Sequence, residues 1–338
     1  MFTNLPFKKS QINHVPFDNF VLGILENYPQ TYDWIYTNFI KIYTNKRTGA
    51  EYFFPKFMWN SCPFLDVYEI PYNMIKDNFE SFAEFLRYCL KKEFYIYSLV
   101  NMKYISQYKR EEDDDHNLVI TNINEEKKEF QIYDFFQNGL YELYNCPFSE
   151  LNQAFEKLPL CKGFDKDTYL NSYSKIVIVK YNNKKNYKFN LRIFQDNIRE
   201  YMECTNLIMH SKLYAIEDNL DDEYYWGMEC WDHLWEGTML KRHFSFMVTH
   251  SQMWEQRYKY FVEKGYFKRS TYIEEEIKKI NNTAKLVLSM YLKTTIIKKK
   301  NIDDVKNKMK FFISEYQKTE ELICNYFLDE KNAILLKK

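Results

Sequence analysis

The chemical feature that stands out in the sequence is a histidine and an aspartate at the ends of two consecutive strand-like runs. His116 opens the run 116–122, and Asp134 lies near the end of the run 130–135. An antiparallel hairpin through a turn at 124–128 brings the two side chains together. A carboxylate bonded to one imidazole nitrogen fixes the tautomer and leaves the other nitrogen free to take a proton. The pair therefore predicts a general base and its orienting carboxylate, which are two parts of a nucleophile–base–orienter triad.

The elements around this pair predict a mixed α+β front half with a short antiparallel sheet. Apolar residues at steps of three and four are typical of helices, and short apolar or alternating runs are typical of strands. Asp18, Asn78 and Ser149 stand where helix N-caps are expected. The predicted elements are helices at 18–28 and 79–90, strands at 94–101, 116–122 and 130–135, and a short helix after 149.

The back half of the chain is predicted to be a further hairpin followed by helices. The hairpin joins the runs 175–181 and 187–193, and the second run alternates apolar and polar residues as a half-buried strand does. Gly265 is placed to end the first of three long helices. Apolar stripes at steps of three and four mark these helices within 240–261, 273–291 and 305–323.

The chain of 338 residues is long enough for one large domain or two modest ones. A polar break at 162–167 is the expected boundary. It gives an α+β region at 1–161 and a hairpin-plus-bundle region at 162–338, which can also pack as one unit.

Composition excludes several classes of function. Lys plus Arg and Asp plus Glu number 47 each, so no net field attracts nucleic acid or an anionic membrane. No stretch approaches the roughly 18 apolar residues of a membrane span, and residues 1–19 do not read as a signal peptide, which predicts a cytoplasmic protein. The seven cysteines include no C-x-x-C pair and the seven glycines form no phosphate-binding loop. Neither a metal nor a nucleotide cofactor is therefore predicted.

The order of these elements and motifs resembles the papain-like cysteine-enzyme fold. The shared features are the N-terminal helix, the helix before an apolar strand, a His-x-x-Val-Ile motif from His116, a charged turn, and Tyr-Asp-Phe around Asp134. The similarity is closest to bacteriocin-processing leader peptidases and to butirosin-type acyltransferases of antibiotic biosynthesis. The segment 226–234 and the helix that carries Arg257 also resemble the helical second half of the acyltransferase-like branch.

This resemblance implies a function in secondary metabolism. The related acyltransferases belong to gene clusters for non-ribosomal peptides and similar natural products, and they use a Cys thioester to move an acyl group from a carrier protein to an amine. The resemblance implies that His116 is the catalytic base and Asp134 its orienter. It also implies an acyl or peptidyl carrier protein and a small-molecule amine as partners, with the carrier's phosphopantetheine as the one prosthetic group involved.

The sequence departs from this family at the nucleophile. The family's Cys opens the first helix, where this chain has Asn19, or Phe20 if the register slips by one. Neither residue is a nucleophile, although an Asn there can hydrogen-bond a carbonyl. Cys62 is the alternative thiol, because the proline that follows it favours a loop, whereas Cys89 lies beside an apolar helix face and is expected in the core. A third possibility is direct general-base catalysis by His116, with no enzyme nucleophile.

Two further groups of residues are candidates for binding substrate. The acidic run 111–115 ends at Asp115 beside the histidine, and it is either a solvated turn or a mouth that attracts an amine. His243, His250 and Arg257 recur every seven residues along one helix flank. They form either a polar flank of the core or an electropositive wall for the phosphopantetheine or an acidic substrate. Side chains two turns apart stand about 10 Å from each other, too far to share a metal ion.

Two classes of function remain. The first is an acyl- or amide-forming transferase that acts on carrier-bound thioesters, and the second is a catalytically inactive papain-like scaffold that binds a carrier domain or a biosynthetic intermediate. The missing Cys favours the scaffold and the His–Asp pair favours the enzyme, so whether the chain is an enzyme stays open. An open cleft at His116 favours chemistry, and Phe20 filling that cleft favours a scaffold. Proteolysis ranks third, since it depends most on the absent thiol.

Overall fold

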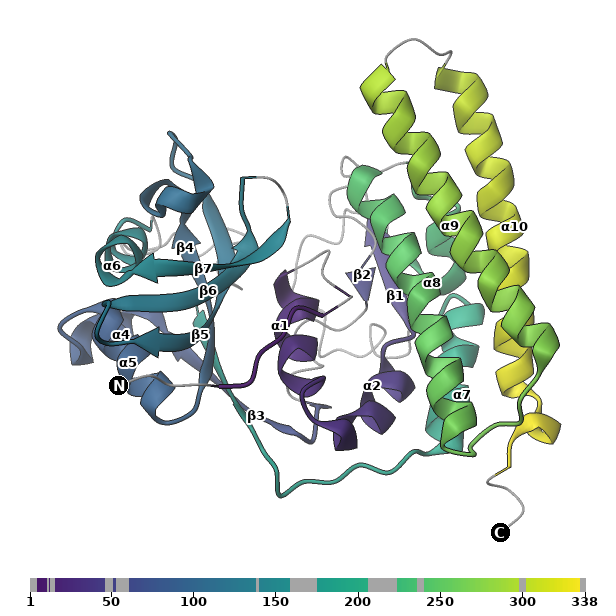
Figure 1. Ribbon diagram of the computed structural model, residues 1–338, viewed down its shortest axis with the longest axis horizontal. Coiled ribbons are helices and arrows are strands. Elements are labelled where there is room, and N and C mark those ends of the chain that lie inside the picture. The colour runs from purple at the N-terminus through teal and green to yellow at the C-terminus, as the bar shows by residue number, and fades with distance from the viewer. Residues whose placement is uncertain are drawn as a thin grey trace. The chain divides into compact units, whose positions relative to one another are not determined.

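The computed structural model describes residues 5–10, 12, 16–45, 51–52, 61–137, 140–158, 175–205, 224–235, 240–297 and 302–334. Two compact units are present, and each takes two stretches of the chain: Met1–Tyr32 with Phe54–Tyr187 in unit 1, and Asp33–Phe53 with Lys188–Lys338 in unit 2. The boundary expected at 162–167 lies outside the described residues. The predicted α+β class is confirmed, because unit 1 is built on an antiparallel sheet and the C-terminal half is helical (Figure 1).

Unit 1 contains a six-stranded sheet in which every neighbouring pair is antiparallel. The three strands predicted from the front half are present, and the last two pair as the predicted hairpin. Across the sheet the strands are β3 (Leu65–Pro71), β8 (Lys175–Tyr181), β4 (Tyr95–Asn101), β5 (Asp115–Asn124), β6 (Glu129–Phe135) and β7 (Tyr141–Pro147).

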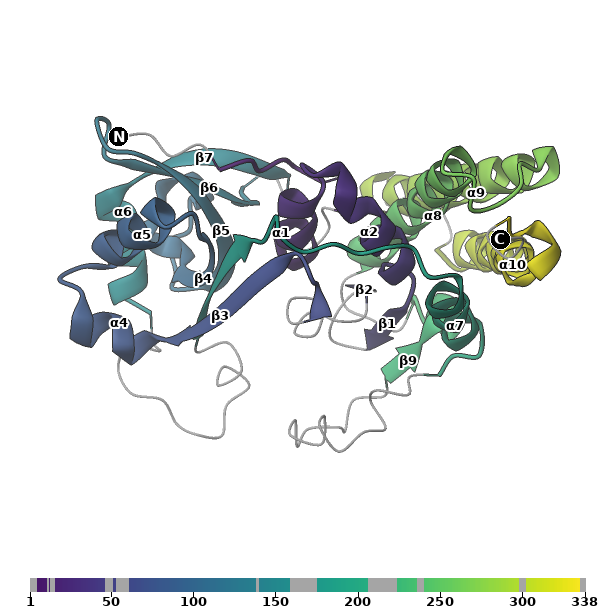
Figure 2. The same ribbon diagram turned by 90° about the horizontal axis from the view of Figure 1, so that it is seen from below.

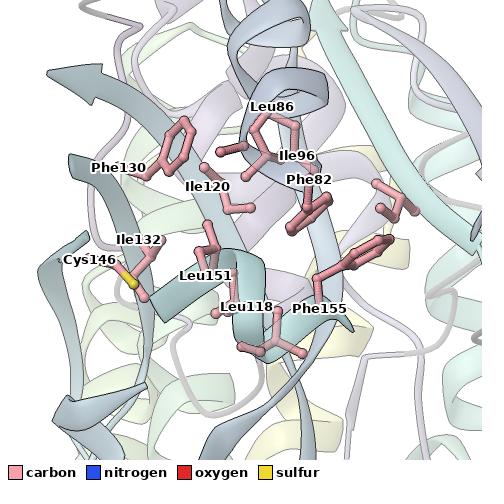
Figure 3. Packing of buried hydrophobic residues seen from close by; sticks show 14 of the residues in the cluster. Phe82, Leu86, Ile96, Leu118, Ile120, Phe130, Ile132, Cys146, Leu151 and Phe155 are labelled. Atoms are coloured by element: carbon pink, nitrogen blue, oxygen red, sulfur yellow. The ribbon is translucent and has the colours of Figure 1, made fainter. Parts of the chain in front are cut away.

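Alternation along the strands gives this sheet two different faces. On one face Leu118, Ile120 and Ile132 join the main hydrophobic cluster of the unit, together with apolar residues of three helices (Figure 3). These helices are α4 (Tyr72–Asn78), α5 (Phe82–Lys91) and α6 (Phe148–Glu156).

The opposite face of the sheet is covered by α1 (Pro16–Leu25), as Figure 2 shows. The ring of Phe20 stacks on Tyr97, with 5.4 Å between the ring centroids. Tyr97 pairs with Val119, whose side chain points away from the cluster that its neighbour Leu118 joins. The N-terminal helix and the helices α4–α6 therefore lie on different sides of the sheet.

The predicted helix starts are corrected by one turn or less. Ser81, not Asn78, is the N-cap of α5, because its side chain accepts a hydrogen bond from the backbone N–H of Glu84 at 3.2 Å. Asn78 is instead the last residue of α4. Asp18 and Ser149 lie inside the first turns of α1 and α6 rather than at their caps.

The second predicted hairpin is wrong. Residues 175–181 do form β8, but this strand pairs with β3 and β4. The expected partner run instead enters α7 (Leu191–Met202), where the side chain of Asn190 caps the helix by accepting from the N–H of Ile193 at 3.1 Å. Phe194, Ile198 and Tyr201 are its buried apolar residues, at helical steps of four and three. The alternation of apolar and polar residues in 187–193 therefore predicted a strand, although the run crosses the N-cap of a helix.

Unit 2 combines a small antiparallel sheet with helices. The three long helices predicted from the apolar stripes are confirmed, and they lie side by side in Figures 1 and 2. Gly265 follows the first of them with a φ of 71°, as expected at a helix end. The elements are α2 (Tyr32–Asn38), β1 (Ile42–Asn45), β2 (Glu51–Tyr52), α7, β9 (Tyr224–Trp226), the 3-10 helix η7 (Gly227–Trp231), α8 (Leu240–Glu263), α9 (Thr271–Ile297) and α10 (Ile302–Leu328).

Within the part of the chain that the structure describes, no helix has both the length and the apolar character that crossing a membrane requires.

Two glycines with positive φ give a matched test of packing in unit 2. Gly227 has a φ of 55°, and a Cβ there would stand 2.0 Å from the carbonyl oxygen of Tyr201, whereas Gly265 has open space within 4 Å. Gly265→Ala should cost only the left-handed backbone penalty of about 1–2 kcal/mol. Gly227→Ala should lower the unfolding free energy by clearly more, measured by urea unfolding with circular dichroism. Equal losses in the two variants would contradict the close approach at Gly227.

Candidate active site

The predicted contact between His116 and Asp134 is present in unit 1. The Nδ1 atom of His116 lies 2.7 Å from Oδ2 of Asp134. The Asp134 side chain is fully buried, while the His116 side chain is 37% exposed. The contact arises because both residues point to the same face of the β5–β6 hairpin, next to Leu118 and Ile132. Since Nδ1 faces the buried carboxylate, the exposed edge of the ring is the one that carries Nε2.

The structure adds a third residue that the sequence did not reveal. The phenol of Tyr108 donates a hydrogen bond to Oδ2 of Asp134, the same oxygen that faces His116. The other oxygen, Oδ1, is buried and has no hydrogen-bond partner among the described residues. With 30 tyrosines in the chain, no spacing or motif in the sequence distinguishes Tyr108 from the rest.

The surroundings of His116 favour a basic imidazole with a fixed tautomer. Burial lowers its pKa, but the charge and hydrogen bond of Asp134, together with the nearby charge of Asp114, outweigh burial and raise the pKa above its usual value of 6.5. Because Asp134 accepts a hydrogen bond from Nδ1–H, the neutral ring carries its proton on Nδ1 and presents the lone pair of Nε2. This is the arrangement that a general base requires.

The residues at the expected nucleophile position do not meet His116. Asn19 is fully buried in α1, and its Nδ2 donates to the carbonyl of Ile12 at 3.4 Å. Phe20 is also fully buried, and it stacks on Tyr97 on the sheet face opposite His116. The expectation that Phe20 or Asn19 faces the imidazole is therefore corrected: the helix that carries them packs on the other side of the sheet.

Neither candidate thiol supplies a nucleophile next to His116. Cys62 is 3% exposed, and burial raises its pKa far above the ordinary range, so the thiol stays protonated. It precedes β3, which is separated from β5 by β8 and β4, a distance of about 14 Å across the sheet. Cys89 lies in the hydrophobic cluster, as predicted, and burial raises its pKa to about 12.

Asp114, rather than Asp115, is the member of the acidic run that acts on the imidazole. Asp115 begins β5 opposite Asn101, so its side chain points to the other face from His116. Burial and the charges of Asp114 and Asp113 raise the pKa of Asp115. The charge of Asp114 instead contributes to the raised pKa of His116.

Of the two alternatives for the flank of α8, the electropositive wall is not formed. His243, His250 and Arg257 are all fully buried in unit 2, so they present no charge to a substrate at the surface. The guanidinium of Arg257 is held by backbone carbonyls, donating to that of Tyr36 at 2.8 Å and to that of Phe39. The guanidinium therefore joins α8 to backbone carbonyls inside unit 2 and does not contact a substrate at the surface.

His250 belongs to a buried network around Glu320, which sequence analysis missed. Glu320 is fully buried on α10, and its two oxygens accept from two indoles and a phenol and lie next to the imidazole of His250. The partners are Trp254 Nε1 at 2.6 Å, Trp231 Nε1 at 2.8 Å, Tyr201 Oη at 2.8 Å and His250 Nε2 at 3.0 Å. Two oxygens offer about four acceptor positions, and both oxygens are hydrogen-bonded by these three donors. With no part of it exposed, the network is structural rather than a binding site.

Hollows of about 660 and 230 Å³ both lie in unit 2, the first between α8 and α9 and the second beside Trp231 and Trp235. His116 lines neither of them. Within the described ranges, no group of three or more His, Cys, Asp or Glu residues is arranged to hold a metal ion.

Comparison with known proteins identifies no family for this chain. A scan against models of protein families finds no match, and a search of curated proteins finds no match either.

Proposed function

We propose that the chain is an acyl- or amide-forming transferase of natural-product biosynthesis in which His116 is the general base and Asp134 orients it. The observation that carries the proposal is the 2.7 Å contact between Nδ1 of His116 and a fully buried carboxylate, on a ring that is still 37% exposed. A partly exposed imidazole held in this way offers Nε2 to a reactant from solution. The acyl donor is a thioester on a carrier protein, and the acceptor is a small-molecule amine.

The proposed reaction uses no enzyme nucleophile. The amine nitrogen attacks the thioester carbonyl while Nε2 of His116 takes a proton from that nitrogen. The tetrahedral intermediate then breaks its carbon–sulfur bond, and the imidazolium returns the proton to the departing thiol. The products are an amide and a free thiol, and the enzyme ends in its starting state. Asp134 stabilises the imidazolium that forms during the reaction.

The proposal uses the resemblance to papain-like enzymes for the His116–Asp134 pair and not for a nucleophile. The order of α1, α5, β4 and the β5–β6 hairpin and the contact within the pair support this use of the resemblance. The face on which α1 packs argues against a papain-like nucleophile at position 19 or 20. A cytoplasmic location in the producing cell fits this proposal.

A second candidate function is an inactive accessory protein that binds a carrier domain or a biosynthetic intermediate. It is favoured by the burial of Asn19, Phe20 and Cys62, none of which reaches the imidazole. A protein with this function binds an acylated carrier without consuming its thioester.

The proposal predicts a transferase that needs no thiol. Acetyl-pantetheine is incubated with a panel of primary amines and the purified chain, and amide formation is followed by mass spectrometry. Turnover should persist in Cys62→Ser and after alkylation with iodoacetamide, because Cys62 lies far across the sheet from His116. Loss of turnover in Cys62→Ser, with folding intact, would show that a thiol attacks. Thioester binding without turnover by the wild-type chain would favour the accessory function.

A further inference from the structure

Tyr108 is delivered to the site by a tightly tied loop between β4 and β5. The loop contains two 3-10 turns, η2 (Met102–Tyr104) and η3 (Ser106–Tyr108). Asn101, fully buried at the end of β4, ties the loop on both sides. Its Oδ1 accepts from the N–H of Lys103 at 3.2 Å, and its Nδ2 donates to Asp113 at 2.9 Å. Asn101 thus holds the loop that carries Tyr108 both near its start and near its end.

The ring of Tyr108 is locked as well as its backbone. The residue is 4% exposed, and its ring lies 5.0 Å from that of Phe136 within the hydrophobic cluster. Lys109, which follows it, has a φ of 53°, a left-handed conformation that residues other than glycine adopt infrequently. The chain therefore turns sharply after Tyr108 while the phenol stays directed at the carboxylate.

We propose that Tyr108 is a positioning residue of the His116–Asp134 pair: its phenol shares Oδ2 with the imidazole N–H, holds the carboxylate in place and limits the negative charge that reaches the ring. This inference deepens the proposed function and rests on it, because His116 needs a fixed orientation only if it transfers protons. A donor on Oδ2 withdraws charge from the oxygen that stabilises the imidazolium. Removing that donor should strengthen the attraction between Asp134 and the protonated ring, and so raise the pKa of His116.

The groups around the pair allow Tyr108 to act as a donor at all relevant pH values. Burial and the charge of Asp134 raise the pKa of Tyr108 well above 10, so its proton stays on the phenol. The other titratable groups close to this cluster are Asp114 ahead of β5, and Tyr141 and Cys146 on β7. Burial also raises the pKa of both Tyr141 and Cys146. They stay neutral, and the acidic side chains close to the pair are Asp114 and Glu142, the cross-strand neighbour of Asp134 on β7.

The test is the titration of His116 in Tyr108→Phe, followed by NMR of the imidazole protons in the full chain. The His116 signal is assigned by its loss in His116→Gln. Tyr144→Phe is the matched control, because the Tyr144 ring also lies against Phe136 but its hydroxyl contacts Ser106 and not Asp134. The pKa of His116 should rise in Tyr108→Phe and stay at the wild-type value in Tyr144→Phe. An unchanged pKa in Tyr108→Phe, or an equal rise in both variants, would overturn the proposal.

This readout separates the role of Tyr108 from the proposed function. If amide formation occurs, the pH at which its rate is half-maximal should rise in Tyr108→Phe together with the pKa, a change that lost packing does not produce. If the wild-type chain forms no amide but the pKa still rises, the transferase proposal fails and Tyr108 remains the residue that positions the pair.

Discussion

His116→Ala is expected to lower the rate of amide formation from acetyl-pantetheine by about 10²–10⁴-fold, the usual contribution of a positioned general base. The loss should appear in the rate at saturating thioester, because the imidazole acts on the attacking amine and not on thioester binding. His233→Ala is a suitable control, since His233 lies in unit 2, where its ring stacks on Tyr225 at 3.3 Å between centroids. If His116→Ala and His233→Ala both keep the wild-type rate, the general-base proposal is wrong.

Asp134→Asn removes the charge of the side chain but keeps its shape, so it tests how that charge affects the pKa of His116 and the rate of amide formation. The raised pKa of His116 depends on Asp134, so its replacement by a neutral amide should let burial dominate and lower that pKa. A general base works when it is unprotonated, and therefore the rate should reach its plateau at lower pH in the variant. The plateau itself should be lower, because no charge stabilises the imidazolium. Rate–pH profiles of the wild type and Asp134→Asn check both effects, and an unmoved midpoint would contradict the assigned role of Asp134.

The hairpin that carries the pair was predictable because it depends on local structure alone. The runs 116–122 and 130–135 are joined by a short charged turn, and side chains in antiparallel strands have a fixed two-residue alternation. These constraints predict the two strands and their turn, but the shared face of His116 and Asp134 also depends on a register shift between Ile120 and Asn122, which brings Val119 opposite Tyr133. Without that shift Asp134 would pair with Val119, on the face opposite His116. The three long C-terminal helices were predictable for a similar reason, since a repeated apolar stripe identifies a helix from its own residues.

The position of α1 was not predictable, because the face on which a helix packs depends on contacts far along the chain. Asn19 and Phe20 occupy a helix that the sequence placed correctly, yet the sheet stands between that helix and His116. Tyr108 was missed for the same kind of reason. Its contact with Asp134 depends on how Asn101 ties an irregular loop, and irregular loops carry no periodic signal.

The Glu320 network shows what periodic patterns leave out. The spacing of His250 and Arg257 predicts a polar flank or an electropositive wall, and Glu320 resembles any charged residue of a surface helix. The partners that bury it come from α7, η7 and α8, three elements far apart in the sequence. Burying a carboxylate is costly unless hydrogen bonds replace its lost hydration, and the donors that do this for Glu320 are visible only once these elements have packed.

Glu320→Ala is therefore expected to destabilise unit 2 by about 3–5 kcal/mol, as is typical when one member of a buried ionic group is removed. The change leaves three donors, the indoles of Trp231 and Trp254 and the phenol of Tyr201, without their acceptor. It also leaves the buried charge of Arg257 without the carboxylate that acts on it. A loss of this size is a large part of the total stability of a typical domain, about 5–15 kcal/mol.

The matched control for Glu320→Ala is Glu321→Ala, one residue along α10 and exposed. It has the same intrinsic helix effect and should change the unfolding free energy by less than about 0.5 kcal/mol. Urea unfolding followed by tryptophan fluorescence suits the comparison, because Trp231 and Trp254 donate directly to Glu320. Similar small losses in both variants would contradict the network.

Acid should weaken the same network in the wild-type chain. Burial lowers the pKa of His250 below its usual 6.5, so the folded state resists the proton that the unfolded state accepts. The stability that His250 supports is thus fully present above about pH 6.5 and decreases as the pH falls below that value. Glu320→Ala removes the carboxylate next to the imidazole but leaves the burial of the ring, so the acid sensitivity should persist in this variant. Tyr52, which lies 3.0 Å from Nδ1 of His250, keeps the neutral ring bonded on its other side.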